Sequence, residues 1–391
     1  MFTLWIPTRE ERYLIVELSP RGERGLLFGV NRDKYLLFRK AWDNFSLATF
    51  AKSKNFLKKK LNVIVVTDES AAYVVKIPVE LKQRSSKNPL TAGELENLLG
   101  QTVSRVFIQH RESAGRALGV NEVDTVLIGS RVFNFKIDGH HVVNPIGFAP
   151  KILTAAIELT FTSRNFFVRL KPLFERHKEF FFTESSRAEL FALSKVQAAP
   201  FALLSLEAET SPFFILTPVA VGHHILRGNI GWSADCFLDF LKGAWAVEED
   251  VAERIYGRYL DRRIGEGAGR SLLKLFRQGA GALLGAIKKS RLKGTVFLKS
   301  SRELPFPLSG RRGAVVFHEP PLHTILHTMG FHVEFENWPL LSRGLFSRLA
   351  PFIEFYASND DLEINHWLRR RLHWLGATVS NQKSHDTMMS G

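Results

Sequence analysis

The sequence is poor in the residues that build covalent or metal-bound scaffolds. Cys236 is the only cysteine among 391 residues, which excludes an intramolecular disulfide framework and a cysteine-clustered zinc site. No apolar run approaches the roughly 18 residues that a membrane-spanning helix needs. The chain begins Met-Phe-Thr-Leu-Trp-Ile and turns charged at residues 9–12, which does not resemble a signal peptide. We therefore expect a cytoplasmic protein.

Motifs of common enzyme classes are also missing. The sequence contains no Walker-type phosphate loop and no Gly-x-Ser-x-Gly nucleophile elbow. His323 and His327 have the i, i+4 spacing of zinc ligands on a helix, but no nearby carboxylate completes the set. Cys236 lies among apolar residues of a predicted helix, which favours an inert buried thiol over a nucleophile. We predict no catalytic residue and no metal site.

What the sequence does contain is a basic, globular composition. The net charge is +14, and the hydrophobic fraction of 45% is that of a folded protein. The charge suits an anionic membrane, an acidic protein surface or nucleic acid, and does not by itself choose among them. With 32 Phe against 6 Tyr, most aromatic side chains are expected in the core. The length suggests two or three domains.

Two stretches of the chain begin with the same pattern of short strands. In the first, strand signals at residues 13–18, 25–30 and 35–38 precede a Lys-rich amphipathic helix and a further strand at 63–66. In the second, a hairpin within residues 201–221 opens the pattern. The elements expected after it are helices at 230–243, 248–260, 272–292 and 322–329, and strands at 296–298 and 315–317. The repetition indicates duplicated halves.

A small α+β unit interrupts the first half. Thr91 and Glu94 form a capping box that opens a long amphipathic helix. The unit starts near residues 77–81, and strands are expected at 125–129, at 132–137 and at 152–162, with turns at Asp138-Gly139 and around Asn144-Pro145.

These features resemble known families. Two hairpin-led α/β halves with an insert in the first resemble the actin and sugar-kinase superfamily. The insert sequence VLIGSRVFNFKIDG (126–139), followed by VNPIGF (143–148), resembles the insertion subdomain of the bacterial cell-division protein FtsA. The resemblance covers about residues 12–375 and marks the chain as a divergent member. It implies an α/β, actin-like two-lobed fold with duplicated hairpin-led α/β halves and a small α+β insertion of the SHS2 type in the first half.

The resemblance also implies a domain order. We expect a first lobe at 1–76 that returns at 164–200, an insert at 77–163, a second lobe at 201–358 with a helical subdomain at about 231–292, and a C-terminal amphipathic helix with a polar tail at 359–391.

A nucleotide site of this superfamily needs glycine-rich hairpin loops whose amides face the phosphates. The first loop here reads Glu17-Leu18-Ser19-Pro20-Arg21-Gly22, in which Pro20 has no amide donor. Arg21 could partly replace that donor as a phosphate contact. The candidate nucleotide-contacting residues of this degenerate loop are Glu17, Ser19 and Arg21.

The other two loops have lost their glycines as well. The second places Glu207, Ala208 and Glu209 before Thr210, and the third reads Leu298-Lys299-Ser300-Ser301. A carboxylate ~4 Å from a phosphate charge costs on the order of 4 kcal/mol at an effective dielectric of 20. The loops predict a pseudo-ATPase that needs no cofactor and binds ATP with magnesium weakly or not at all. An opposing interpretation makes Glu207 or Glu209 a magnesium ligand or general base.

The C-terminal residues 362–376 predict an amphipathic helix. Tryptophan beside arginine suits the headgroup boundary of an anionic membrane, and the pattern looks like the FtsA membrane-targeting helix. Arg371, near the middle of the apolar stripe, would have to snorkel. The expected membrane-binding residues are Ile364, Trp367, Leu368, Arg369, Arg370, Leu372, Trp374 and Leu375. The alternative is that this helix packs on the body of the protein.

The preferred interpretation is a non-enzymatic cell-division scaffold on the inner face of the membrane. It would link a tubulin-like, FtsZ-like filament to an anionic membrane surface and self-associate into filaments. A pilus or secretion assembly platform shares the fold and is the first alternative. An active actin-fold ATPase is disfavoured by the loops. A nucleic-acid partner is supported by charge alone and is not expected.

Overall fold

The structure is a computed structural model that describes residues 10–19, 22–52, 61–68, 70–82, 88–176, 180–218, 223–333, 344–357, 364–365 and 367–368. The chain divides into two compact units. Unit 1 comprises Met1–Ala188, Phe331–Glu334 and Arg348–Gly391. Unit 2 comprises Glu189–Gly330 and Phe335–Ser347. Residues 348–391 thus belong to the first unit although they follow the second in sequence.

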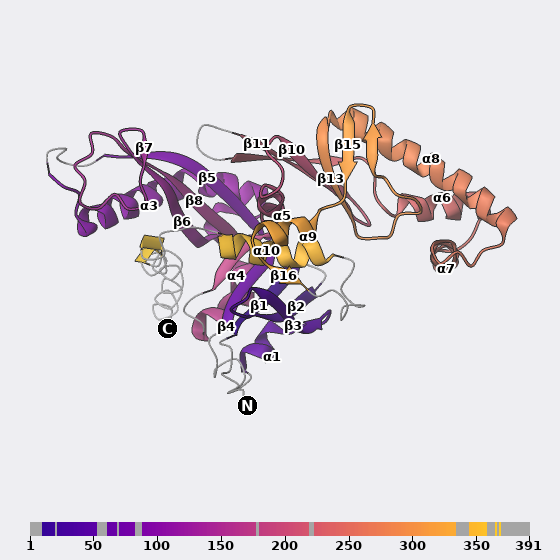
Figure 1. The fold of residues 1–391 in the computed structure, drawn as a ribbon, viewed down its shortest axis with the longest axis horizontal. Coiled ribbons are helices and arrows are strands. Elements are labelled where there is room, and N and C mark those ends of the chain that lie inside the picture. Colours follow the sequence, from indigo (N-terminus) through magenta and orange to yellow (C-terminus); the bar gives the residue numbers. More distant parts are fainter. Residues whose placement is uncertain are drawn as a thin grey trace, which may run out of the picture. The chain divides into compact units, whose positions relative to one another are not determined.

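Unit 1 is built on a six-stranded mixed sheet, the first-half sheet (Figure 1). In order across the sheet its strands are β16 (His332–Val333), β3 (Tyr35–Trp42), β2 (Gly22–Val30), β1 (Glu11–Ser19), β4 (Leu61–Thr67) and β9 (Phe181–Glu184). The first three in sequence are antiparallel, and β4 and β9 continue from β1 in parallel. This confirms the predicted hairpin-led start of the first half.

Strand β1 is covered on both faces, as its buried run of apolar residues requires. Leu14, Val16 and Leu18 pack in one core with apolar residues of α4 (Arg164–Arg176). On the opposite face Tyr13 contacts Phe352 of α10 (Leu345–Ala357), with ring centroids 4.9 Å apart. The short helix α1 (Leu47–Lys52) begins where the predicted Lys-rich helix does, and residues 53–60 of that prediction lie outside the described residues.

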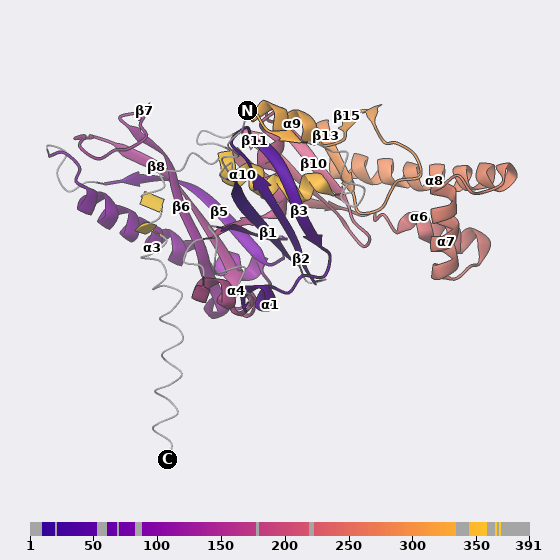
Figure 2. The ribbon, with the colours of Figure 1, turned by 60° about the horizontal axis from the view of Figure 1, so that its bottom comes forward.

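The insert forms a separate four-stranded antiparallel sheet, the insert sheet, in the order β5-β8-β6-β7. The strands are β5 (Ala72–Leu81), β6 (Thr125–Ile137), β7 (His140–His141) and β8 (Leu153–Ser163). Figure 2 shows helix α3 (Ala92–Ala117) running along this sheet, and the predicted capping box of Thr91 and Glu94 starts the helix. A short 3₁₀ turn, Glu122–Asp124, leads into β6.

The prediction of two strands at 125–129 and 132–137 was wrong in one respect. Residues 129–131 do not interrupt the strand. β6 is one continuous strand, and its pairing to β8 shifts at two bulges. At the second bulge Asn134 has a φ of 59°. The predicted Asp138-Gly139 turn is confirmed, with φ of 49° and 87° at its two residues.

Unit 2 repeats the order of five strands of the first-half sheet and adds its sixth strand, β14, at the opposite edge. In order across this second-half sheet the strands are β12 (His223–Ile230), β11 (Ser211–Pro218), β10 (Phe201–Leu206), β13 (Gly294–Ser300), β15 (Val315–His318) and β14 (Gly310–Arg312). The first three in sequence are again antiparallel, and β13 and β15 again continue in parallel. Two sheets that share the order of five strands, with an insert in the first half, make this an actin-like fold.

The helices of unit 2 correct one prediction and confirm others. Residues 231–235 are not helical, because β12 ends at Ile230 and helix α6 (Cys236–Trp245) begins only at Cys236. Helix α7 (Glu249–Leu260) lies where a helix was predicted, and α8 (Glu266–Ser290) starts six residues earlier than predicted. α9 (Leu322–Thr328) stops before Gly330, whose φ is 76°.

The described helices include none that is both long and apolar enough to cross a bilayer.

Candidate functional site

The first predicted phosphate loop is the turn between β1 and β2. Glu17 lies opposite Arg24 across the hairpin and its carboxylate is 3.9 Å from that guanidinium. The Ser19 hydroxyl donates to the Gly22 carbonyl at 3.1 Å. Both predicted side chains therefore interact within their own hairpin. The third, Arg21, lies outside the described residues.

The second loop, between β10 and β11, is closed by its own hydrogen bonds. The Glu207 amide donates to the Thr210 carbonyl at 3.1 Å, and the Ser205 hydroxyl donates to the Glu207 carboxylate. The loop carbonyls are used as well, since the amide of Ala234 donates to Glu207 at 2.8 Å. Glu209 and Thr210 are exposed at the tip. The amide of residue 207 thus points at protein rather than at a site where phosphate would bind.

The third loop contacts the second directly. The Ser301 amide donates to the Leu206 carbonyl at 2.9 Å, and the Ser300 hydroxyl lies 3.5 Å from the same oxygen. The Lys299 ammonium donates at 2.8 Å to Glu189, whose side chain is fully buried. A lysine held by a buried carboxylate is not free to neutralise a phosphate.

An arginine that the sequence interpretation did not consider holds this region together. Arg302 donates to Asp235 at 2.7 Å and to Glu253 at 3.1 Å, so it joins the third loop to the start of α6 and to α7. The only signal in the sequence is the position of Arg302 directly after the third loop. The structure brings the second and third loops together, as an actin-like site requires, but fills the region with internal polar contacts.

None of the described residues form a group of three or more histidine, cysteine or carboxylate side chains that could hold a metal ion. His323 and His327 stack with ring centroids 6.4 Å apart.

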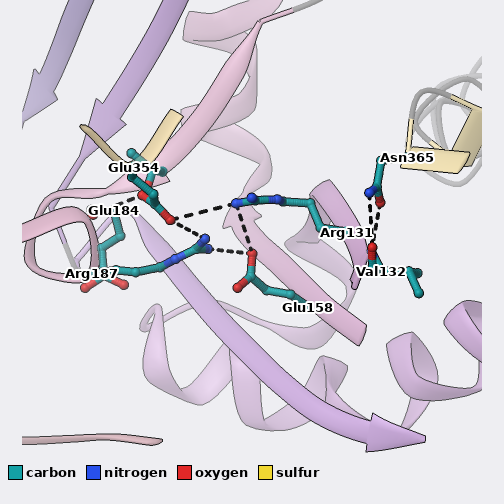
Figure 3. Close-up of polar contacts among 8 residues, drawn as sticks. Arg131, Val132, Glu158, Glu184, Arg187, Glu354 and Asn365 are labelled. Carbon is teal, nitrogen blue, oxygen red and sulfur yellow. Dashed lines mark hydrogen bonds and ion pairs between the residues drawn. The ribbon is translucent and has the colours of Figure 1, made fainter. Parts of the chain in front are cut away.

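A second polar cluster lies in unit 1, between the insert sheet and the elements of the first half (Figure 3). Arg187 of α5 (Ser185–Leu193) donates to Glu158 of β8 at 2.6 Å and forms a second ion pair with Glu354 of α10. Arg131 of β6 lies 3.8 Å from each of the same two carboxylates. Thr183 of β9 also donates to Glu354, at 2.5 Å. We call Arg131, Glu158, Arg187 and Glu354 the buried ion cluster.

The cluster is buried deeply enough to shift its protonation equilibria. Burial alone would raise the pKa of the Glu158 carboxyl. The positive charges of Arg187, Arg131 and Lys76 outweigh that effect and lower the pKa of Glu158. Burial also disfavours the charged form of Arg187, but Glu158 and Glu354 raise the pKa of the guanidinium above its usual value. Both partners therefore stay ionised, as buried charges do only when they are paired.

The described part of the C-terminal helix docks on the insert. We call residues 364, 365, 367 and 368 the C-terminal segment. The Asn365 side chain accepts from the Val132 amide at 2.8 Å and donates to the Val132 carbonyl at 3.0 Å, and Figure 3 shows this pair beside the buried ion cluster. Asn365 is 1% exposed. The Asn365 side chain thus takes the place of a neighbouring strand on the side of β6 that β7 pairs with only at Lys136 and Ile137, and we call this side the edge of β6.

Apolar side chains flank this contact. Leu368 is fully buried in the core of the insert, and Ile364 and Trp367 pack against the same core, half-buried. In this position Leu368 faces protein and cannot contact lipid. Ile364, Trp367 and Leu368 thus pack on the body of the protein, which is the alternative to membrane binding given in the sequence analysis. Membrane contact by these three residues would require the segment to leave the insert. The other expected membrane-binding residues, Arg369, Arg370, Leu372, Trp374 and Leu375, lie outside the described residues.

Of the comparisons with family models, curated proteins and solved structures, only the last found similar proteins. No protein-family model matches it, and no curated protein matches its sequence. A PilM–PilN type IV pilus biogenesis complex is 13% identical with a TM-score of 0.41, over 94% of this chain and 99% of that chain. The cytoplasmic domain of EpsL, an inner membrane component of the type II secretion system of Vibrio cholerae, is 11% identical with a TM-score of 0.33, over 82% and 94%.

A third similar structure comes from Bacteroides thetaiotaomicron and is described as having an actin-like ATPase fold and unknown function. It is 12% identical with a TM-score of 0.34, over 84% of this chain and 99% of that chain.

We predict that Glu158→Gln destabilises the protein by about 3–5 kcal/mol, because it leaves two buried guanidinium groups with one carboxylate. The pKa of Glu158 is lower in the folded than in the unfolded chain, so its stabilisation is present above the unfolded value of about 4.3. It is lost as the pH falls through the folded value. Chemical denaturation of both proteins across this pH range measures the difference, which should shrink on acidification.

The matched control is Glu112→Gln, which removes an exposed i, i+4 pair with Arg116. Its cost should be about 0.5 kcal/mol or less. Equal losses for the two variants would show that the buried ion cluster is not a special constraint.

Proposed function

We propose that this protein is a non-hydrolysing actin-fold scaffold that works by holding a short peptide segment on its insert. The observation that carries the proposal is the docking of the C-terminal segment on β6. One asparagine pairs with both backbone groups of Val132, and Leu368 inserts into the insert core. Backbone pairing at a sheet edge with side chains in apolar positions is a recurrent mode of peptide recognition.

The described residues of the docked segment contact the insert through one asparagine and three apolar side chains. A competing segment of similar sequence could make the same contacts. Such a segment would need an asparagine flanked by apolar residues. We infer that the insert serves as an assembly point, occupied here by the chain's own C-terminal segment and open to an equivalent segment of a partner.

The nucleotide loops support a scaffold rather than an enzyme. The Glu207 amide, the Leu206 carbonyl and the Lys299 ammonium are all engaged by protein groups. A phosphate would have to break these contacts and approach the Glu207 carboxylate as well. The scaffold therefore functions without ATP turnover.

A pilus or secretion assembly platform is the version of this role that we favour. It is compatible with peptide docking on the insert and does not require the C-terminal segment to contact lipid. The second candidate is the FtsA-like division scaffold, which binds a tubulin-like filament and uses the C-terminal helix as a membrane anchor. It is favoured by the insert motif, whose Asp138-Gly139 turn and Gly147, with a φ of 88°, fold as expected.

The first prediction concerns ATP. Purified protein should release no phosphate from ATP with magnesium above the rate without protein, because the loops present no free cradle. The measurement is a coupled phosphate-release assay. Steady turnover that disappears in Glu207→Ala, with Glu209→Ala as the neighbouring control, would contradict the proposal and favour the altered-site ATPase.

The second prediction concerns the docking site. A fluorescent peptide of residues 358–375 should bind the Asn365→Ala protein more tightly than the native protein, because the native site is already occupied in cis. The same peptide with Asn365→Ala should bind the Asn365→Ala protein about tenfold more weakly than the native peptide does, since a buried hydrogen-bonding group is lost. Fluorescence anisotropy measures the affinity of each peptide for each protein. If both peptides bind both proteins equally, the insert is not a peptide site.

The third prediction separates the two candidates. The division scaffold should pellet with phosphatidylserine vesicles, and Trp374→Glu should abolish pelleting, because a charge enters the apolar stripe. Ser384→Glu adds the same charge in the tail and serves as the control. The assembly platform predicts no difference between the two variants.

A further inference from the structure

Helix α8 carries a line of positive charge on the side away from its core. Its buried residues are Leu272, Phe276, Gly279, Leu283 and Ile287. Figure 2 shows α6 and α7 together on one side of α8, and α6 packs against it. At 100° per residue, Arg270, Lys274, Arg277 and Lys288 fall in an arc of about 60° on the opposite side and extend over about 27 Å. All four are exposed. We call these four residues the basic stripe.

The basic stripe lacks the ion pairs that neighbouring cations make. Arg254 on α7 pairs with Asp250 at 2.6 Å, and Arg302 pairs with Asp235 and Glu253. Within the described parts of the chain, no member of the basic stripe has an ion-pair partner. The stripe is therefore a concentration of charge that the described fold leaves unneutralised.

Helix stability does not explain the stripe. Lys288 lies in the last turn, where a cation interacts favourably with the helix dipole, but Arg270, Lys274 and Arg277 lie inside the helix, beyond the first turn that Glu266 opens, where the dipole gives a cation no advantage. Arg270 and Lys274 are four residues apart, and Lys274 and Arg277 three, which are the spacings at which like charges repel on a helix. A partner of opposite charge would turn this repulsion into attraction.

The residues between the cations indicate the shape of that partner. Gly281 and Gly285 lie on the same exposed side, and a side chain at either would meet open space. A smooth surface of this kind lets another backbone approach closely. The stripe is also straight, because it follows a single helix, so a rod-shaped partner can contact its full length.

The same residues argue against other anionic partners. Helices that lie on membranes place large apolar side chains beside their cations, and the described residues of α8 expose none. Single-stranded nucleic acid is bound by aromatic side chains among the cations, which the stripe also lacks.

We propose that the outer face of α8 is a docking surface for an acidic α-helix of a partner protein, which packs over Gly281 and Gly285 with its carboxylates along the basic stripe. This role is separate from peptide docking on the insert, which uses unit 1.

The test uses the full-length protein and a labelled helical peptide of repeated Glu-Ala-Ala-Ala units as the probe. The triple variant Arg270→Glu, Lys274→Glu, Arg277→Glu should weaken binding by about tenfold or more, because three attractions become repulsions. The control Arg105→Glu, Lys151→Glu, Arg312→Glu makes the same change in net charge at exposed residues outside α8 and should weaken it far less. Equal weakening by both would overturn the proposal in favour of a general effect of net charge.

Two further measurements separate the partners. Gly281→Met adds no charge and favours the helix, so it should weaken binding of the acidic helical peptide at least severalfold only if that peptide packs closely over α8. If Gly281→Met binds like the native protein, the helix-packing proposal is wrong. The helix-packing proposal is also wrong if the triple variant loses binding to phosphatidylserine vesicles or single-stranded DNA but still binds the peptide.

Discussion

The buried ion cluster is the interaction on which unit 1 depends. Two arginines and two glutamates are removed from water together, and removing either member of a pair leaves a buried charge without compensation. Its residues come from the insert (Arg131 and Glu158), from α5 (Arg187) and from α10 (Glu354). Because its four charges come from the insert, α5 and α10, the cluster ties the insert sheet to the first half.

The position of the insert sheet in turn prepares the docking site. Arg131 and Val132 are consecutive residues of β6, so the strand that supplies a cation to the cluster also offers its edge to Asn365. A side chain, and not a strand, pairs with the backbone groups of Val132. A short segment can therefore make this contact without adding a strand to the sheet. In this way β6 contributes both to the buried ion cluster and to the surface that holds the C-terminal segment, while the second and third loops of unit 2 hydrogen-bond to one another.

The sequence predicted elements whose signals are local. The hairpins, the capping box of Thr91 and Glu94 and the Asp138-Gly139 turn depend on neighbouring residues, and the structure confirms them. It did not predict β12, because that edge strand is mostly exposed and has no clear alternation, and its end was interpreted as the start of a helix. The division of β6 at Gly129 was wrong because a bulge absorbs the residue that resembled a turn.

The candidate sites were less predictable because their members are distant in sequence. Arg131 and Glu354 are brought together only by the tertiary fold, and isolated charges in a sequence normally indicate solvated surface. Arg302 was missed for the same reason. That the nucleotide loops are degenerate stays a prediction from their residues, whereas the hydrogen bonds that close the second and third loops could be seen only in the structure.

Backbone amide exchange at Val132 tests most directly whether the insert is a peptide-docking surface. In the native protein this amide is bonded to the Asn365 side chain and should exchange slowly, and in Asn365→Ala it should exchange about tenfold faster or more while amides of the paired β8 strand stay protected. Unchanged protection of Val132 in the variant would contradict the account, because the edge of β6 would then be covered by something other than the C-terminal segment.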